Sequence, residues 1–188
     1  MKRKYLLTIL FYILLCSCLS QTSNLYKIST ESMRPYLKAG DYVLTESKFE
    51  TLTYGDIVVY EHRESGQYDK EIYVFRIVAL PHDTIQIENE IPIINGKKNQ
   101  INEIESASYT AYDLSFDRFE ELQPNGVKIE ILRFSEIPQD TTSKISFHIP
   151  SNQYFVMGDF RSNAYDSRYY GPINKKQILG KVIKVQEK

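Results

Sequence analysis

After the N-terminal segment, apolar residues occur in short runs or alternate with polar residues, which is typical of strands and not of helices. The run 91–94 is followed by Asn95-Gly96, a strong signal for a tight hairpin turn. We expect no long amphipathic helix and find no internal repeat. The predicted strands cover residues 42–44, 57–60, 72–80, 83–88, 91–94, 147–150, 154–157 and 178–185. This pattern predicts an all-β protein.

Residues 99–145 depart from the pattern, because they are more polar and less regular and contain only short apolar pieces such as 127–132. We interpret them as a small inserted subdomain. The β core then consists of residues 26–98 and 146–188.

The N-terminus begins with the basic stretch Met1-Lys2-Arg3-Lys4, followed by an apolar run from residue 5. Even if it is counted to residue 19, this run is shorter than the ~20 residues of a membrane span, so residues 1–19 indicate an export signal. Leu15-Cys16-Ser17-Cys18 resembles a bacterial lipobox, which would make Cys18 a lipidation site. An uncleaved signal anchor is the alternative. Both place the domain at the bacterial membrane, on its extracytoplasmic side.

The composition narrows the chemistry. The chain has 188 residues and a net charge of -1, which gives no reason to expect a nucleic-acid partner. Both cysteines, Cys16 and Cys18, lie in the N-terminal apolar segment, so the predicted β core has no thiol. The three histidines are scattered along the chain. We therefore expect no metal ion and no cofactor.

The stretch Ser32-Met33-Arg34-Pro35 places a serine in an irregular segment, because Pro35 fixes φ and opposes regular structure. Gly40-Asp41 then turns the chain into the strand at 42–44. The serine hydroxyl is expected on a loop at the mouth of a sheet. On this stretch alone, an ordinary surface serine is the favoured interpretation.

Four blocks change that interpretation. They are TESMRPYL (30–37), GDIVVY (55–60), FRIVALPHD (75–83) and GDFRSNAYDSR (158–168), with Asn95-Gly96-Lys97 as a further match. In this order they resemble the type I signal peptidase family, the membrane-bound serine endopeptidases that remove export signals. The resemblance implies two antiparallel sheets with a smaller inserted domain.

The resemblance also implies roles for individual residues. Ser32 corresponds to the nucleophile, and Thr30 to a hydroxyl that donates to the oxyanion alongside the Ser32 backbone N–H. Asp166 and Arg168 correspond to a structural salt bridge, and Arg76 is retained. For these three charged residues we favour a structural role over a chemical one.

The general base is missing from its family position. The family uses a neutral lysine to take the proton of the serine, and that position is Phe75 here. The serine that orients the lysine is replaced by Ala164, and a neighbouring asparagine by Phe160. The substitutions together indicate removal of the whole base site.

Three other residues carry a basic nitrogen nearby in the sequence. Lys70 lies an odd number of positions from Phe75, so on one strand it would point to the opposite face, and it falls in a predicted loop. His82 replaces a family glycine at a turn, and His62 lies just beyond the second strand. We expect all three to be solvent-exposed polar residues.

Two functions remain open. The first is a signal peptidase I-like serine endopeptidase that removes signal peptides from exported preproteins at the outer face of the cytoplasmic membrane, with Ser32 activated by another group. The alternative is a catalytically degenerate member that binds extended peptides along a sheet edge as a binding or accessory module. In that case Phe75 and Phe160 would fill the former base pocket.

Overall fold

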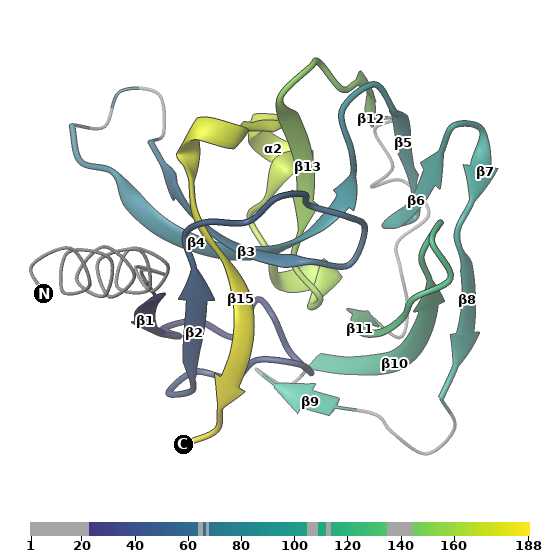
Figure 1. Ribbon diagram of the computed structural model, residues 1–188. Helices are drawn as coiled ribbons and strands as arrows, with labels where there is room; N and C mark the ends of the chain where they lie inside the picture. The colour runs from purple at the N-terminus through teal and green to yellow at the C-terminus, as the bar shows by residue number, and fades with distance from the viewer. Residues whose placement is uncertain (1–22, 64–65, 67, 105–108, 112–113, 135–144) are drawn as a thin grey trace, which may run out of the picture.

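The computed structural model describes residues 23–63, 66, 68–104, 109–111, 114–134 and 145–188 (Figure 1). The predicted export segment 1–19, including Cys18, lies outside these residues. No helix within them is long and apolar enough to cross a membrane.

The largest sheet has seven strands, and every neighbouring pair is antiparallel. The C-terminal strand lies between the second and third strands of the chain, so both ends of the described chain belong to one sheet. In spatial order the strands are β1 (Ser23–Lys27), β2 (Tyr42–Glu46), β15 (Ile178–Gln186), β3 (Ile57–His62), β4 (Glu71–Ala79), β13 (Gln153–Met157) and β14 (Ile173–Asn174).

A second antiparallel sheet has the order β12 (Ile145–His148), β5 (Thr84–Glu88), β6 (Ile91–Ile94) and β7 (Lys97–Lys98). Residues along β5 alternate between exposed and buried, as the sequence pattern predicts. Asn95 and Gly96 have φ values of 51° and 78°, the left-handed conformation that a tight hairpin requires. The predicted turn is therefore confirmed.

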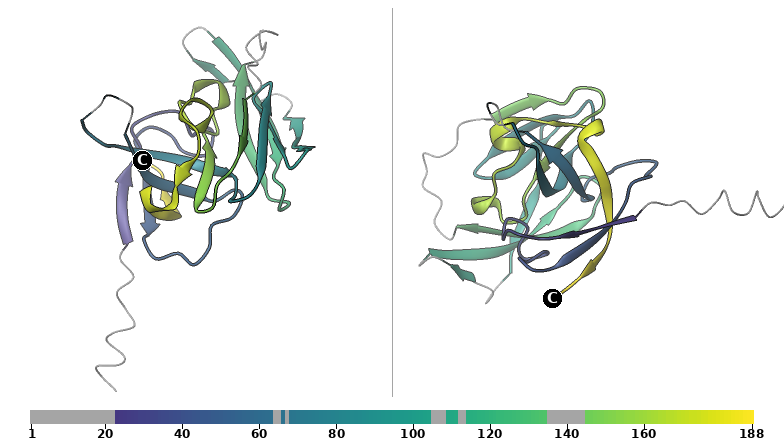
Figure 2. Two further views of the ribbon diagram at one scale, coloured as in Figure 1. Left: turned by 90° about the horizontal axis from the view of Figure 1, so that it is seen from above. Right: turned by 90° about the vertical axis from the view of Figure 1, so that its left-hand side faces the viewer.

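A third sheet is formed by strands that the sequence pattern did not resolve. They are β8 (Gln100–Glu103), β9 (Tyr109–Ala111), β10 (Leu114–Leu122) and β11 (Lys128–Phe134), with β8 and β11 on either side of β10 and β9 also paired with it. In Figure 2 this sheet lies beside the large sheet instead of continuing it. The boundary of the predicted insertion, 99–145, stays a prediction, since residues 135–144 lie outside the described chain.

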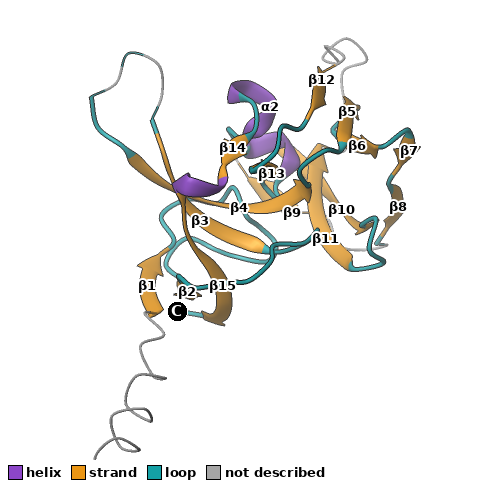
Figure 3. Ribbon diagram, turned by 45° about the horizontal axis from the view of Figure 1, so that its top comes forward, coloured by secondary structure: helices purple, strands orange, loops and turns teal. Residues whose placement is uncertain are grey.

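Helical structure in the described chain is short, as Figure 3 shows. It consists of η1 (Arg161–Asn163), α2 (Ser167–Tyr170) and η2 (Lys175–Gln177). Asp166 caps α2, because its side chain accepts a hydrogen bond from the backbone N–H of Arg168. The all-β antiparallel fold is confirmed, and its longest described helix has only four residues.

Candidate active site

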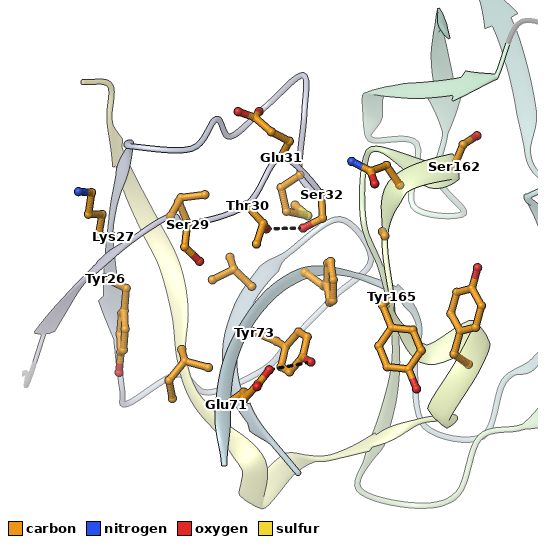
Figure 4. A pocket seen from close by; sticks show the side chains of 18 residues that line it. Tyr26, Lys27, Ser29, Thr30, Glu31, Ser32, Glu71, Tyr73, Ser162 and Tyr165 are labelled. Carbon is orange, nitrogen blue, oxygen red and sulfur yellow. Dashed lines mark hydrogen bonds between the residues drawn. The ribbon is translucent and has the colours of Figure 1, made fainter. Parts of the chain in front are cut away.

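Ser32 lies in the irregular turn that follows β1, where the Pro35 motif predicts a loop. Its Oγ is 2.9 Å from the Oγ1 of Thr30, which is a hydrogen-bonding distance (Figure 4). Met33 and Leu37 are 1% and 0% exposed. Because these apolar side chains anchor the turn in the core, the serine hydroxyl has a defined position next to the threonine hydroxyl.

The two hydroxyls open onto a cavity of about 910 Å³. One wall is the segment 26–33, which includes Ser32, and the opposite wall is the segment 71–75 of β4. Residues 162–165 and Tyr169 close a third side. The cavity therefore lies between chain segments that are far apart in the sequence.

The β4 wall presents an unpaired strand edge. One edge of β4 pairs with β3 from Glu71 to Arg76, but the other pairs with β13 only from Arg76 onward. Residues 71–75 therefore have a neighbouring strand on one side only within the described chain. β1, on the opposite wall, is likewise paired on one side only, with β2. An extended peptide in the cavity could pair with such edges.

Phe75 lies against the loop that carries Ser32 and is 2% exposed. A methyl group built on Gly158 would lie 2.4 Å from the Cβ of Ala164, 2.6 Å from the backbone oxygen of Ser32 and 3.2 Å from Cε1 of Phe75. The side chains of Phe75 and Ala164 and the backbone oxygen of Ser32 thus converge at one point beside Gly158. An aromatic ring and a methyl group lie beside the Ser32 backbone, and neither can accept a proton.

Phe160 does not share this pocket, contrary to the expectation from the sequence. Its ring packs edge-on against Phe116 at 4.6 Å and against Tyr109 at 6.0 Å, in a cluster with Leu132 of the third sheet. Its backbone N–H donates to the carbonyl of Ser32 at 3.0 Å. Phe160 therefore connects the third sheet to the loop that carries Ser32 and does not line the cavity.

Two buried ion pairs hold the segment 158–168 that carries Ala164. Arg168 binds Asp166 through Nε at 2.8 Å and Nη2 at 2.9 Å, as the sequence predicts. Arg76 binds Asp159 through Nε at 2.8 Å and Nη2 at 2.6 Å, a partner that the sequence did not indicate. Burial lowers the pKa of both guanidiniums, but the adjacent aspartates outweigh it and the net pKa is raised.

The sequence profile described as "Signal peptidase, peptidase S26" matches residues 2–185. The chain belongs to this family. Signal peptidase I P of Bacillus subtilis subsp. natto is 31% identical to it, over 82% of this chain and 72% of the relative. Signal peptidase IB of Staphylococcus aureus strain COL is 29% identical, over 84% and 74%. Signal peptidase I of Buchnera aphidicola from Acyrthosiphon pisum is 28% identical, over 85% and 67%.

Among solved structures, a signal peptidase I from Enterococcus faecalis V583 is similar at 20% sequence identity and a TM-score of 0.40. The similarity covers 73% of this chain and all of that chain.

The cavity lining includes none of the three candidate substitute bases, Lys70, His62 and His82. Lys70 is exposed and ion-paired with Glu61, and His82 is exposed in a turn at φ 74°. His62 was expected to be exposed, but it is buried, with its ring 4.0 Å from that of Tyr170. The aromatic residues around it come from distant segments, which the local sequence could not indicate.

One buried ion pair was missed entirely. Arg161 Nη1 is 2.5 Å from Glu121 Oε2, and both side chains are 0% exposed. Glu121 also accepts hydrogen bonds from Asn99 at 3.0 Å and Gln123 at 2.5 Å. This network joins the third sheet to the segment that lines the cavity. No sequence signal links Glu121 to Asn99 or Arg161, because these residues are far apart along the chain.

Proposed function

We propose that this protein binds extended segments of exported preproteins in the cavity beside Ser32 and lacks the hydrolytic base of its family. The observation that carries the proposal is the buried ring of Phe75, packed beside Ser32 with Ala164 next to it. The relatives named signal peptidase I support an exported preprotein as the bound partner.

Binding is supported by the walls of the cavity. An extended segment placed between them could form backbone hydrogen bonds with the unpaired edge of residues 71–75, as in β-strand addition. The Ser32–Thr30 turn would then lie alongside the bound backbone. Main-chain pairing supplies affinity for many sequences, and side-chain subsites supply selectivity.

Hydrolysis is disfavoured by the other groups of the cavity. A serine hydroxyl needs a base within hydrogen-bonding reach, and the titratable lining residues include Lys27, Glu31 and Glu71. Glu31 is ion-paired with Arg34, and Glu71 accepts a hydrogen bond from the Tyr73 hydroxyl at 3.1 Å. In Figure 4 the Lys27 side chain points away from Ser32.

A second candidate is a serine endopeptidase that removes signal peptides. It is favoured by the 2.9 Å contact between Ser32 and Thr30, which keeps the nucleophile and the oxyanion donor of the family together. In this case a group brought by the substrate, or a rearranged side chain, would take the serine proton.

The experiment compares peptide binding and cleavage by the full chain in detergent. The probe is a fluorescent peptide that spans the cleavage site of an exported preprotein, and the variants are Ser32→Ala and Phe75→Lys/Ala164→Ser. We expect the wild type to bind without cleaving and the double variant to cleave. Loss of the base costs about 10⁶-fold in kcat in enzymes of the triad type, so any gain should be measurable.

Adding Ser32→Ala to the double variant should abolish its cleavage. Cleavage by the wild type that Ser32→Ala removes would instead establish the endopeptidase candidate. Absence of peptide binding to the wild type would overturn both functions.

We further propose that Cys18, as the lipidated first residue of the mature chain, attaches the protein to the extracytoplasmic side of the bacterial membrane. Cells grown with labelled palmitate should incorporate label into the wild type and not into Cys18→Ala. Equal labelling of the two would contradict lipidation at this position.

A further inference from the structure

Three tyrosines form one face of the cavity, and we call them the tyrosine subsite. Tyr73 comes from β4, Tyr165 from the segment before α2, and Tyr169 from α2 itself. The Tyr165 and Tyr169 rings are stacked at 5.0 Å with an interplanar angle of 27°. Tyr165 is 46% exposed and Tyr169 is 66% exposed. A stacked aromatic pair thus stands open to solvent inside the cavity.

The tyrosine subsite rests on the half-buried ring of Tyr170. Tyr170 lies 5.6 Å from Tyr165 and 6.4 Å from Tyr73, so its ring bridges the two sides of the subsite. The Tyr170 hydroxyl is hydrogen-bonded to that of Tyr60, which is fully buried. Rings held in this way lose little conformational entropy when a ligand contacts them. Rigid aromatic side chains are the residues that most often dominate binding energy.

The position of the subsite relates it to Ser32. Tyr73 and Phe75 lie on the same face of β4, with ring centroids 6.0 Å apart. In an extended peptide, side chains on one face are also spaced two residues apart, at about 6.6 to 6.8 Å. A peptide that pairs with the edge of residues 71–75 can thus place one side chain near Phe75 and another on the tyrosine subsite. In Figure 4 the Tyr73 and Tyr165 side chains lie on the same side of the Ser32–Thr30 pair.

We propose that the tyrosine subsite binds one aromatic or large apolar side chain of the extended segment and so selects which segments the protein holds. This inference rests on the proposed function, because it assumes a peptide in the cavity. The neighbouring Ile72 and Val74 also line the cavity, which makes this part of the lining predominantly apolar and aromatic. Glu71 is the acidic group at the same wall, and it already accepts a hydrogen bond from the hydroxyl of Tyr73.

The test uses the full chain in detergent and fluorescent alanine-rich peptides of about eight residues, roughly the length of a longer strand. Each peptide carries a single phenylalanine, lysine or additional alanine, and the substituted position is moved along the peptide. Dissociation constants are measured for the wild type, Tyr165→Ala/Tyr169→Ala and the control Tyr68→Ala. Tyr68 is 95% exposed and lies outside the cavity lining, so its loss removes an aromatic side chain without touching the subsite.

We expect the wild type to prefer phenylalanine at one peptide position. The double variant should lose about tenfold in affinity for that peptide while its affinity for the alanine peptide stays unchanged, and Tyr68→Ala should behave as the wild type. Peptide binding with no difference between the wild type and the double variant would overturn the subsite but leave the proposed function standing. A preference for lysine would also overturn it, in favour of a cation-binding subsite. Failure of every peptide to bind the wild type would overturn both.

Discussion

Replacing Phe75 with lysine tests whether an amine at this position would be shielded from water. The Phe75 side chain is 2% exposed and packs against the rings of Tyr60 at 6.4 Å and Tyr73 at 6.0 Å. Loss of this burial should cost about 1.5 to 3 kcal/mol of unfolding free energy. Burial also disfavours the charged amine, and a pKa depressed by about two units adds about 2.7 kcal/mol. We therefore expect Phe75→Lys to lose about 4 to 6 kcal/mol at pH 7.

The sign of the pH dependence distinguishes these two contributions. An unfolded lysine has a pKa of about 10.4, and the buried amine would have a lower one. Between these two values the unfolded chain binds more protons than the folded chain, so the stability of the variant rises with pH. The destabilisation caused by burying the charged amine is present in full below the folded pKa and disappears above about pH 10.4. The destabilisation caused by the lost packing does not change with pH.

The assay is urea unfolding of Phe75→Lys and of Phe75→Met at pH 7 and at about pH 9.5, where the lysine would be largely neutral in the fold. Phe75→Met controls for the lost ring, because methionine is apolar and similar in size. We expect the gap in unfolding free energy between the two variants to narrow at the higher pH. A gap that stays constant would mean that the amine reaches water in the cavity, and it would refute the idea that position 75 is shielded from water.

Three further changes test the framework around the site. Gly158→Ala should destabilise the fold by at least about 1 to 3 kcal/mol, because the added methyl would clash with Ala164 and with the backbone of Ser32. Thermal unfolding against the wild type measures the loss, and an unchanged midpoint would contradict this packing. Glu121→Gln should cost about 3 to 5 kcal/mol in urea unfolding by leaving Arg161 buried without its charge partner, whereas a loss under 1 kcal/mol would argue that water reaches the pair. Burial raises the pKa of the Tyr60 and Tyr170 hydroxyls, so their contribution to stability is present below about pH 10 and is lost as the pH rises further. Above about pH 10, the unfolding free energy of Tyr170→Phe should therefore fall less steeply with pH than that of the wild type. An identical slope for the two proteins would contradict the raised pKa.

Much of the β core could be predicted from local patterns. The alternation along residues 84–88 and the Asn95-Gly96 turn appear in the structure as expected, because side-chain direction in a strand repeats every second residue. The four strands of the third sheet were not predicted. Several of their residues are charged, such as Glu121 and Arg133, and these are buried only because distant partners bind them.

The candidate site divides in the same way. The candidate roles of Ser32 and Thr30, and the phenylalanine at the family's base position, could be inferred from the sequence, since each depends only on which residue occupies a position in an ordered motif. The surroundings of Ser32 could not, because the cavity is built from segments more than a hundred residues apart.

By itself, the sequence determined the strand pattern of the core, the family and the absence of a proton acceptor at position 75. Only the tertiary structure decided that Phe75 is packed against the loop that carries Ser32, that Phe160 joins the third sheet and that His62 is buried. It also decided that Tyr73, Tyr165 and Tyr169 meet at one face of the cavity. The physical reason is range: periodicity and turn chemistry act between neighbouring residues, whereas burial and side-chain contact depend on sheet order and register, which bring distant segments together.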